Sequence, residues 1–339
     1  MRNAPVLTSI LMAVGLCCSV PQLFAQNAWP SRMEQNQPSE PSAQVRIDAG
    51  GQQRTALIHG PIGKARGASK SPLVLVFHGG GGTGAGAERQ YGMDAVADQS
   101  GFIVAYPDGV DKHWADGRSE SNKNVDDIGF VTSLIDYLAE NYDVDKNRVF
   151  ACGMSNGALF SNYLALRFSQ RIKAIASVAG AIAENNSYLA PSHPVSVLLI
   201  HGTDDEFVPF DGGAIGKGMK GSVGGKALSH AETLRKWLAF DGGVKQSTQA
   251  EIESDGRSAR GFRNVSVMTP ATIKTYTTNS GCLVEDVVIQ NAGHAWPGHV
   301  CRGLFGMDGV TPMNVDASKV IAEFFQRVER VPASKQGQF

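Results

Sequence analysis

The chain has 339 residues, of which 42% are hydrophobic and 19% are charged. This length and composition suit one large or two small globular domains with a sizeable core. The formal net charge at pH 7 is -1, so the chain has no overall basic field that would attract nucleic acid or an anionic membrane surface. Its partners must therefore be inferred from individual sites.

Residues 1–25 have the features of a secretory signal peptide. One cation, Arg2, precedes an apolar stretch that is too short to span a bilayer comfortably, and Ala25 is a small residue at which a signal peptidase could cut. No other segment has the length and apolarity of a membrane span. Residues 26–43 are polar and rich in Pro, Gln and Ser, which predicts an unstructured leader. We therefore expect the protein to be secreted or periplasmic.

Apolar segments alternate with amphipathic segments along the rest of the chain. Strands are expected where the run is short and apolar or alternating, over residues 44–61 (a strand pair), 72–80, 102–109, 148–153, 172–180, 195–202 and 284–290. Helices are expected where apolar residues repeat with helical spacing, over residues 87–101, 126–142, 156–168, 230–240 and 317–328. This order predicts an α/β fold with a mostly parallel sheet and helices on both faces.

Two shorter features complete this pattern. Residues 211–226 are rich in glycine and lysine, which predicts a mobile loop. Ser229 follows this loop and is expected to cap the helix over 230–240. Residues 331–339 are expected to form a C-terminal tail.

The cysteines need an explanation because an exported protein meets oxidising conditions. Cys152 lies within an expected strand, and we expect it to be a small buried core residue. Cys282 and Cys301 bracket the segment "NAGHAWPGH", and we expect them to form a disulfide that holds this segment in place. The alternative is two unpaired thiols. Neither their spacing nor their neighbours resemble a zinc site.

The segment "GMSNG", residues 153–157, lies between an expected strand and an expected helix. A Gly-x-Ser-x-Gly sequence in this position is typical of a nucleophile elbow, in which the serine occupies a strained turn and the glycines leave room for the chain to reverse. The turn would lift the Ser155 hydroxyl clear of the sheet. It would also direct the backbone N–H of Asn156 toward the place where negative charge develops.

A serine nucleophile needs a base and an acid that orients it. Where the nucleophile lies on such an elbow, the acid and then the histidine follow it in the chain. His230, His294 and His299 satisfy this order. His230 is expected to be a solvated residue at the start of a helix. We favour His294 over His299 because it follows the strand over 284–290 on a loop that Pro297 would stiffen.

The acid is expected just beyond the strand over residues 195–202, because ligands approach a parallel sheet at the carboxyl ends of its strands. Asp204, Asp205 and Glu206 all lie there. Spacing alone leaves the choice among these three carboxylates open.

Six motifs in order resemble a known family. They are "FHGGGG", "YPDG" followed by "WADGR", "VDDIGF", "CGMSNGA", "HGTDDEFVPF" and "GHAWPG". Together they resemble the esterases that include secreted polyhydroxybutyrate depolymerases and feruloyl or acetyl esterases. The resemblance implies an α/β-hydrolase fold with one catalytic domain over residues 44–330. It also implies a triad of Ser155, Asp205 and His294.

The glycine run "HGGGGTG" completes the expected site. Glycines let a backbone N–H approach a substrate carbonyl oxygen closely, and we expect Gly81 to donate to the oxyanion together with Asn156. Gly80 and Gly82 are the alternatives. Three aromatic residues are expected to contact substrate: Trp296 and Phe207 because they lie near the base and the acid, and Trp114 because the resemblance implies it.

The resemblance implies a serine esterase that forms an acyl-enzyme and requires no metal or organic cofactor. The expected substrates are small or oligomeric esters, first of all hydroxyalkanoate oligomers. Feruloyl or acetyl groups on plant polysaccharide fragments are the alternative, as is acyl transfer by the same fold. We disfavour a serine peptidase because the chain has no room for a domain that gates peptides. A non-catalytic envelope protein would have no use for a triad.

Overall fold

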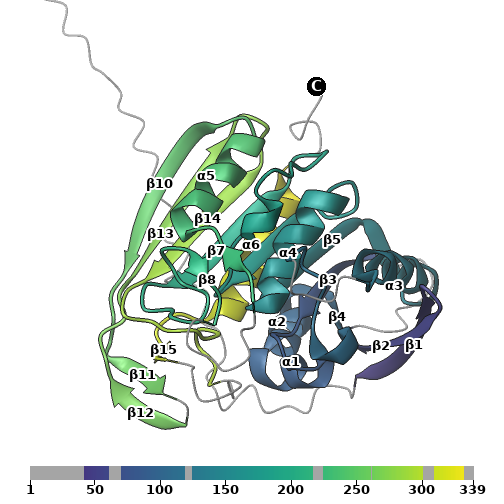
Figure 1. Cartoon of the computed structure of the whole chain (residues 1–339), viewed down its shortest axis with the longest axis horizontal. Coiled ribbons are helices and arrows are strands. Elements are labelled where there is room, and N and C mark those ends of the chain that lie inside the picture. Colours follow the sequence, from purple (N-terminus) through teal and green to yellow (C-terminus); the bar gives the residue numbers. More distant parts are fainter. Residues whose placement is uncertain are drawn as a thin grey trace, which may run out of the picture. The chain divides into compact units, whose positions relative to one another are not determined.

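A ten-stranded sheet organises the part of the chain that the computed structural model describes (Figure 1). The described residues belong to one unit, residues 39–339, and comprise 42–60, 70–118, 124–216, 224–260, 262–300 and 309–331. The expected signal peptide, nearly all of the expected leader and most of the expected C-terminal tail lie outside them.

The strands of this sheet are, in spatial order, β1 (Ala43–Ala49), β2 (Gln52–His59), β4 (Ile103–Pro107), β3 (Ser71–Phe77), β5 (Val144–Met154), β6 (Ala174–Val178), β7 (Ser196–Gly202), β14 (Leu283–Ile289), β13 (Ala271–Thr278) and β10 (Val244–Ile252). The strands from β4 to β14 in this order run parallel, and an antiparallel pair extends the sheet at each edge. The parallel strands are almost completely buried, as their apolar sequences predict.

Helices cover both faces of the sheet. One face carries α3 (Asp127–Asn141), α4 (Asn156–Phe168) and α5 (His230–Phe240), and the other carries α1 (Gly84–Tyr91), α2 (Met93–Ser100) and α6 (Ala317–Arg330). Alternate strand residues serve the two layers. Phe77 packs edge-on against Phe160 of α4, whereas Phe150 stacks on Phe325 of α6. The expected α/β fold, with a mostly parallel sheet between helices, is therefore confirmed.

One expected helix is divided in two. The periodicity over 87–101 predicts a single helix, but the chain turns at Gly92, which has a left-handed φ of 68° and separates α1 from α2. A Cβ at Gly92 would lie 2.2 Å from the ring of His299. The break thus lets a distant segment, near the carboxyl end of the chain, pack against this turn.

Strands at one edge of the sheet were not expected from the sequence. In β10 most residues are exposed and polar, so it lacks the apolar signal on which the strand prediction depends. Its residues form a strand because they pair with β13, which in turn pairs with β14. The local sequence therefore does not predict this edge of the sheet, which depends on pairing between separate segments of the chain.

Small strands and two short helices complete the described elements. They are β11 (Arg257–Arg260), β12 (Arg263–Ser266) and β15 (Thr311–Pro312) in one sheet, β8 (Gly213–Ala214) and β9 (Lys226–Ala227) in another, and the 3₁₀ helices η2 (Val110–Lys112) and η3 (Glu184–Asn186). Strands β8 and β9 pair the two ends of the expected glycine-rich loop. The expected N-cap is confirmed: Ser229 and Glu232 form a capping box at the start of α5.

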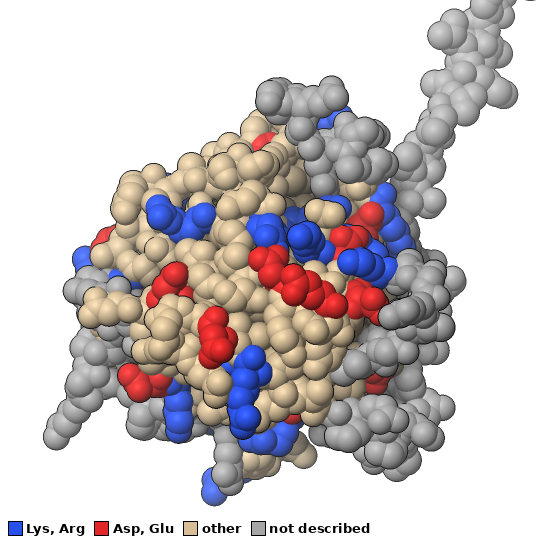
Figure 2. Space-filling view, turned by 90° about the vertical axis from the view of Figure 1, so that its right-hand side faces the viewer, with Lys and Arg blue, Asp and Glu red and all other residues tan. Residues whose placement is uncertain are grey.

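The surface carries charges of both signs. Figure 2 shows lysine, arginine, aspartate and glutamate side chains interspersed on one face, between wide areas without charge. Across the described residues, we find no helix with the length and apolarity needed to cross a membrane.

Asp241 is a buried carboxylate at the end of α5. It is 1% exposed, and neither carboxylate oxygen has a hydrogen-bond partner within the described residues. Burial raises the pKa of Asp241 to about 7, although the nearby Val195 N–H, Cys282 thiol and Ser280 hydroxyl oppose this shift. Because the native pKa is raised, the stabilisation from this group is fully present below the pKa of an unfolded aspartate. It is lost progressively as the pH rises to about 7.

We predict that Asp241→Asn flattens the pH dependence of stability. The amide cannot ionise, so the variant should lose fewer degrees of Tm than the wild type between pH 5 and pH 8.5, and should melt a few degrees higher at pH 8.5. Thermal unfolding followed by circular dichroism measures both. The exposed Asp48→Asn variant is the control, and parallel curves for Asp241→Asn and wild type would contradict the assignment.

Candidate active site

Ser155 occupies a strained turn between β5 and α4. Its φ of 56° and ψ of -120° are rare for a residue with a side chain, and such a conformation costs about 1–3 kcal/mol. The Ser155 N–H donates to Val178 O at 3.0 Å, which attaches the turn to β6. Residues held in strained conformations concentrate at functional sites, so this turn marks Ser155 as a candidate nucleophile.

The flanking glycines are needed for steric reasons. A Cβ at Gly153 would lie 2.6 Å from the Gly157 carbonyl, and a Cβ at Gly157 would lie 2.3 Å from Phe77 O. Any side chain at either position would collide with backbone atoms. The glycines therefore allow β5, β3 and the start of α4 to meet beside Ser155, as the elbow sequence predicts.

Asp205 and His294 form a hydrogen-bonded pair at the same edge of the sheet. Asp205 follows β7, His294 follows β14, and these two strands run parallel. His294 Nδ1 lies 2.8 Å from Asp205 Oδ2. A carboxylate accepts only, so Nδ1 carries the proton and Nε2 of a neutral ring is free to act as a base.

The neighbours of Asp205 hold it ionised. Its Oδ1 accepts 2.9 Å hydrogen bonds from the backbone N–H groups of Phe207 and Val208, and its Oδ2 lies 3.2 Å from His201 Nε2. Burial alone would raise the pKa of Asp205. The charge that His294 carries when it is protonated and the hydrogen bonds from both histidines outweigh burial and hold the pKa of Asp205 well below its usual range.

His201 is a functional neighbour that the sequence analysis did not select. Its Nε2 contacts two acceptors, Asp205 Oδ2 at 3.2 Å and Val208 O at 3.0 Å, so this nitrogen carries the proton. Its side chain is fully buried. The available signal was its position, since it is the last residue but one of the strand that precedes the acid.

The other carboxylates and histidines considered lie elsewhere. Asp204 and Glu206 are exposed. His299 lies 3.5 Å from Asp316. His230, expected to be solvated, is instead 3% exposed and pairs with Asp286 at 2.6 Å, because the first turn of α5 packs on the sheet. Of the three candidate carboxylates and three candidate histidines, the structure thus pairs Asp205 with His294.

Ser155 lies two strands away from Asp205, across β5, β6 and β7. Within the described residues its hydroxyl makes no hydrogen bond, and so none to His294. In structures without substrate such contacts are often long and shorten only in the substrate complex. The structure therefore places all three side chains at the carboxyl ends of neighbouring parallel strands and joins two of them directly.

The glycine run lies against Ser155 and Asn156, but the N–H of Gly81 is already engaged in a backbone hydrogen bond. A Cβ built on Gly79 would lie 3.6 Å from Ser155 Cβ, and one on Gly80 would lie 3.7 Å from Asn156 Cβ. The N–H of Gly81 donates to Lys112 O at 2.8 Å, and the N–H of Gly82 donates to Gly79 O at 2.9 Å. These bonds contradict the choice of Gly81.

Gly80 takes the place of Gly81 as the candidate donor. Its N–H makes no hydrogen bond within the described residues. Asn156 is the first residue of α4, where backbone N–H groups have no partner within the helix. The Gly80 and Asn156 N–H groups are therefore the pair available to an oxyanion.

His78 fixes the start of the glycine run. Its Nδ1 lies 2.8 Å from Gly79 O, and its Nε2 lies 3.0 Å from the N–H of Gly109. A carbonyl only accepts and an N–H only donates, so His78 is a neutral ring protonated at Nδ1. Burial lowers its pKa, which favours this neutral form.

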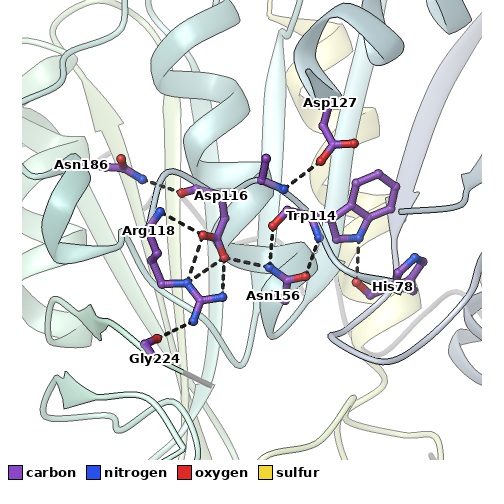
Figure 3. A network of polar contacts seen from close by, with 9 residues as sticks. His78, Trp114, Asp116, Arg118, Asp127, Asn156, Asn186 and Gly224 are labelled. Carbon is purple, nitrogen blue, oxygen red and sulfur yellow. Dashed lines mark hydrogen bonds and ion pairs between the residues drawn. The ribbon is translucent and has the colours of Figure 1, made fainter. Parts of the chain in front are cut away.

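Two of the three expected substrate contacts are core residues. Trp114 is fully buried, donates from Nε1 to His78 O at 3.0 Å (Figure 3), and stacks on Phe160. Trp296 is also fully buried and stacks on Tyr91 with ring centroids 4.2 Å apart. Both expectations were wrong, because each indole fills a gap between a loop and the layers beneath it.

Phe207 does lie beside the candidate base. Its ring centroid is 4.9 Å from that of His294, and the residue is half-buried. It is therefore the aromatic candidate for a substrate contact that the structure leaves accessible.

The expected disulfide is not supported. Cys282 is a free cysteine that is 2% exposed, and burial raises its pKa to about 12. It precedes β14, so the length of that strand separates it from the His294 loop. Cys301 lies outside the described residues. Cys152 is fully buried in the sheet, as expected.

No group of three or more His, Cys, Asp or Glu side chains within the described ranges is arranged to hold a metal ion.

Comparisons with known proteins find similarity to esterases. The family model described as phospholipase/carboxylesterase matches residues 64–223. NocK of Nocardia uniformis subsp. tsuyamanensis, which is named as an esterase, is 29% identical over 81% of this chain and 79% of its own length. A protein of Aspergillus niger named as feruloyl esterase C is 26% identical over 52% of this chain and 71% of its own length.

Two solved structures share the fold. An acetyl xylan esterase from Aspergillus awamori aligns with a TM-score of 0.52 at 14% identity, covering 84% of this chain and 99% of its own. A dienelactone hydrolase-like phosphotriesterase from metagenomic libraries aligns with a TM-score of 0.50 at 15% identity, covering 85% and 99%. At these identities the likeness concerns the fold alone.

The sheet, the strained serine turn and these likenesses define an α/β-hydrolase fold. Within that fold class, the chain is similar to esterases over most of its length, and these similarities support a hydrolase of the carboxylesterase type.

We predict that Asp205→Asn lowers kcat for ester hydrolysis by about four orders of magnitude, because an amide cannot hold His294 in the required tautomer. The matched control is Asp204→Asn, which changes an exposed neighbour and should keep wild-type activity. Steady-state kinetics at pH 6, 7 and 8 measure both. Equal losses in the two variants would contradict the choice of Asp205.

Proposed function

We propose that this esterase hydrolyses carboxylic esters with Ser155 as nucleophile, His294 as general base and Asp205 as the acid that orients the base. The observation that carries the proposal is the strained conformation of Ser155 at the same sheet edge as the Asp205–His294 pair. A strained serine has no structural role here that a glycine would not fill at lower cost.

The proposed reaction has two steps. His294 takes the Ser155 proton as the hydroxyl oxygen attacks the ester carbonyl, and the N–H groups of Gly80 and Asn156 stabilise the oxyanion. The tetrahedral intermediate then breaks its bond to the alcohol, which leaves with the proton from His294. Water, deprotonated by the same histidine, attacks the acyl-enzyme and releases the acid and Ser155.

The substrate class that we favour is a feruloyl or acetyl ester of a plant polysaccharide fragment. Support comes from relatives that are named as feruloyl esterase and as a bifunctional acetylxylan esterase/xylanase, and from the half-buried Phe207 ring beside His294, which could pack against an aromatic acyl group. Hydroxyalkanoate oligomers are the second candidate, because the ordered motifs also resemble polyhydroxybutyrate depolymerases.

We further propose that the protein is exported and loses residues 1–25. The support is the sequence of that segment, with its single early cation, short apolar stretch and Ala25. Mass spectrometry of the exported protein should give an N-terminus at Gln26. Retention of residues 1–25 in the exported protein would contradict this proposal.

Ser155→Ala should lower kcat by about six orders of magnitude if the three side chains act as a unit. A fluorophosphonate probe should label the wild type and leave the variant unlabelled, while circular dichroism shows that both are folded. A variant that keeps a tenth of the wild-type hydrolysis would exclude Ser155 as the nucleophile.

A substrate screen decides among the ester classes. Methyl ferulate, acetylated xylo-oligosaccharides and hydroxybutyrate trimers should be compared by kcat/KM, and we expect the feruloyl or acetyl ester to be preferred. A higher kcat/KM for the hydroxybutyrate trimer would contradict this preference and favour hydroxyalkanoate oligomers as the substrate class. A parallel incubation with a sugar acceptor would show, by an acylated sugar product, whether acyl transfer competes with hydrolysis.

A further inference from the structure

The loop over residues 113–118 contains a buried ion pair that supplies no reacting group in the proposed mechanism. Asp116 is fully buried and Arg118 is 4% exposed. The guanidinium donates from Nε at 2.9 Å and from Nη2 at 2.7 Å to Asp116 Oδ2, and from Nε at 3.0 Å to Oδ1 (Figure 3). Burying both charges is costly, and an apolar pair would often be as stable. Stability alone therefore does not explain why this ion pair is buried.

Asp116 reaches the residue next to the candidate nucleophile. Asn156 Nδ2 donates to Asp116 Oδ2 at 2.7 Å and to Trp114 O at 3.2 Å, and Asn156 Oδ1 accepts from the Trp114 N–H at 2.8 Å. Figure 3 shows this amide enclosed between the two residues. With both donor and acceptor engaged, the Asn156 side chain has one orientation, and this restrains the backbone that carries it.

The ion pair is itself attached to two other segments. Asn186 of η3 donates from Nδ2 to Asp116 O at 2.7 Å, and Arg118 Nη1 donates to Gly224 O at 2.9 Å. Gly117 has a φ of +84°, and a Cβ there would lie 2.3 Å from Asn186 Oδ1. The loop is thus held between the segment that follows β6 and the segment that follows the acid.

We propose that Asp116 is a positioning residue: together with Arg118 it fixes Asn156 so that the Asn156 N–H points at the oxyanion. This inference rests on the proposed function. The Ser155 turn is strained, so its geometry persists only where the surroundings over-determine it. An oxyanion donor acts through its alignment with the charge that develops, so a small rotation at residue 156 reduces kcat more than substrate binding.

Asp127 provides a matched control. It is also a buried aspartate, pairs with Arg54 at 2.7 Å, and accepts from the Ala115 N–H of the same loop at 2.8 Å. Its hydrogen bonds do not include Asn156. Asp127→Asn and Asp116→Asn each replace an acceptor facing an arginine with an amide, so both should lower Tm.

The two variants should differ in kinetics. With a soluble ester that the wild type hydrolyses, Asp116→Asn should lower kcat by about 10- to 100-fold with KM nearly unchanged. Its Ki for a trifluoromethyl ketone analogue, which forms a tetrahedral oxyanion on the enzyme, should rise by the same factor. Because its hydrogen bonds do not include Asn156, Asp127→Asn should keep kcat and Ki within about threefold of wild type.

Asn156→Ala tests the contact between Asn156 and Asp116 without changing a buried charge. It also tests the positioning role if Asp116→Asn does not fold. It keeps the backbone N–H but loses the amide, so it should show the same fall in kcat and rise in Ki. If both residues act through one contact, the double variant should lose little more than the larger single loss.

Two results would overturn the positioning role: wild-type kcat and Ki in Asn156→Ala, or equal losses of kcat in Asp116→Asn and Asp127→Asn. Ser155→Ala, measured in the same assay, separates this from a failure of the proposed function. Residual activity in Ser155→Ala rejects the proposed function, whereas loss there with normal Asn156→Ala kinetics rejects only the positioning role.

Discussion

The left-handed backbone of Ser155 is the constraint on which the site depends. The chain leaves β5, reverses at Ser155 and enters α4. One glycine on each side, Gly153 and Gly157, allows backbone from β3 to lie against the turn. Strain of this kind persists only where neighbouring packing leaves no alternative. The buried parallel strands β3, β5 and β6 and the loop over 113–118, which holds Asn156, provide that packing.

The site also depends on buried polar groups that take no part in the proposed chemistry. His78 holds the glycine run, His201 holds the acid, and Asp116 holds Asn156. Each engages a donor or acceptor that would otherwise be buried without a partner. The proposed reaction uses three side chains, and at least these three further polar side chains keep the site in position.

The sequence predicted the elements that carry a strong periodic signal, and it predicted the order of Ser155, Asp205 and His294. Predictions from the sequence were wrong where a residue's contacts lie far away in the chain. Gly81 was chosen within a uniform glycine run, but the carbonyl of Lys112 engages its N–H. Trp114 and Trp296 were assigned to substrate, but both fill the core. Cys282 and Cys301 were paired because of the segment between them, although a full strand separates Cys282 from it.

The sequence by itself determined the α/β layering, because apolar periodicity and capping residues act over neighbouring positions. The Gly-x-Ser-x-Gly sequence between a strand and a helix also predicted the serine turn, although the atoms that exclude side chains at Gly153 and Gly157 include the Phe77 carbonyl of β3. Spacing left the carboxylate that meets His294 open, and the family resemblance implied Asp205; the tertiary structure brings these two side chains together. Only the tertiary structure decided which glycine N–H stays free and that Asp116 reaches Asn156. These features depend on contacts between residues that are 31, 40 and 89 positions apart in the chain. Such contacts follow from the register and packing of whole strands, which no local segment of sequence specifies.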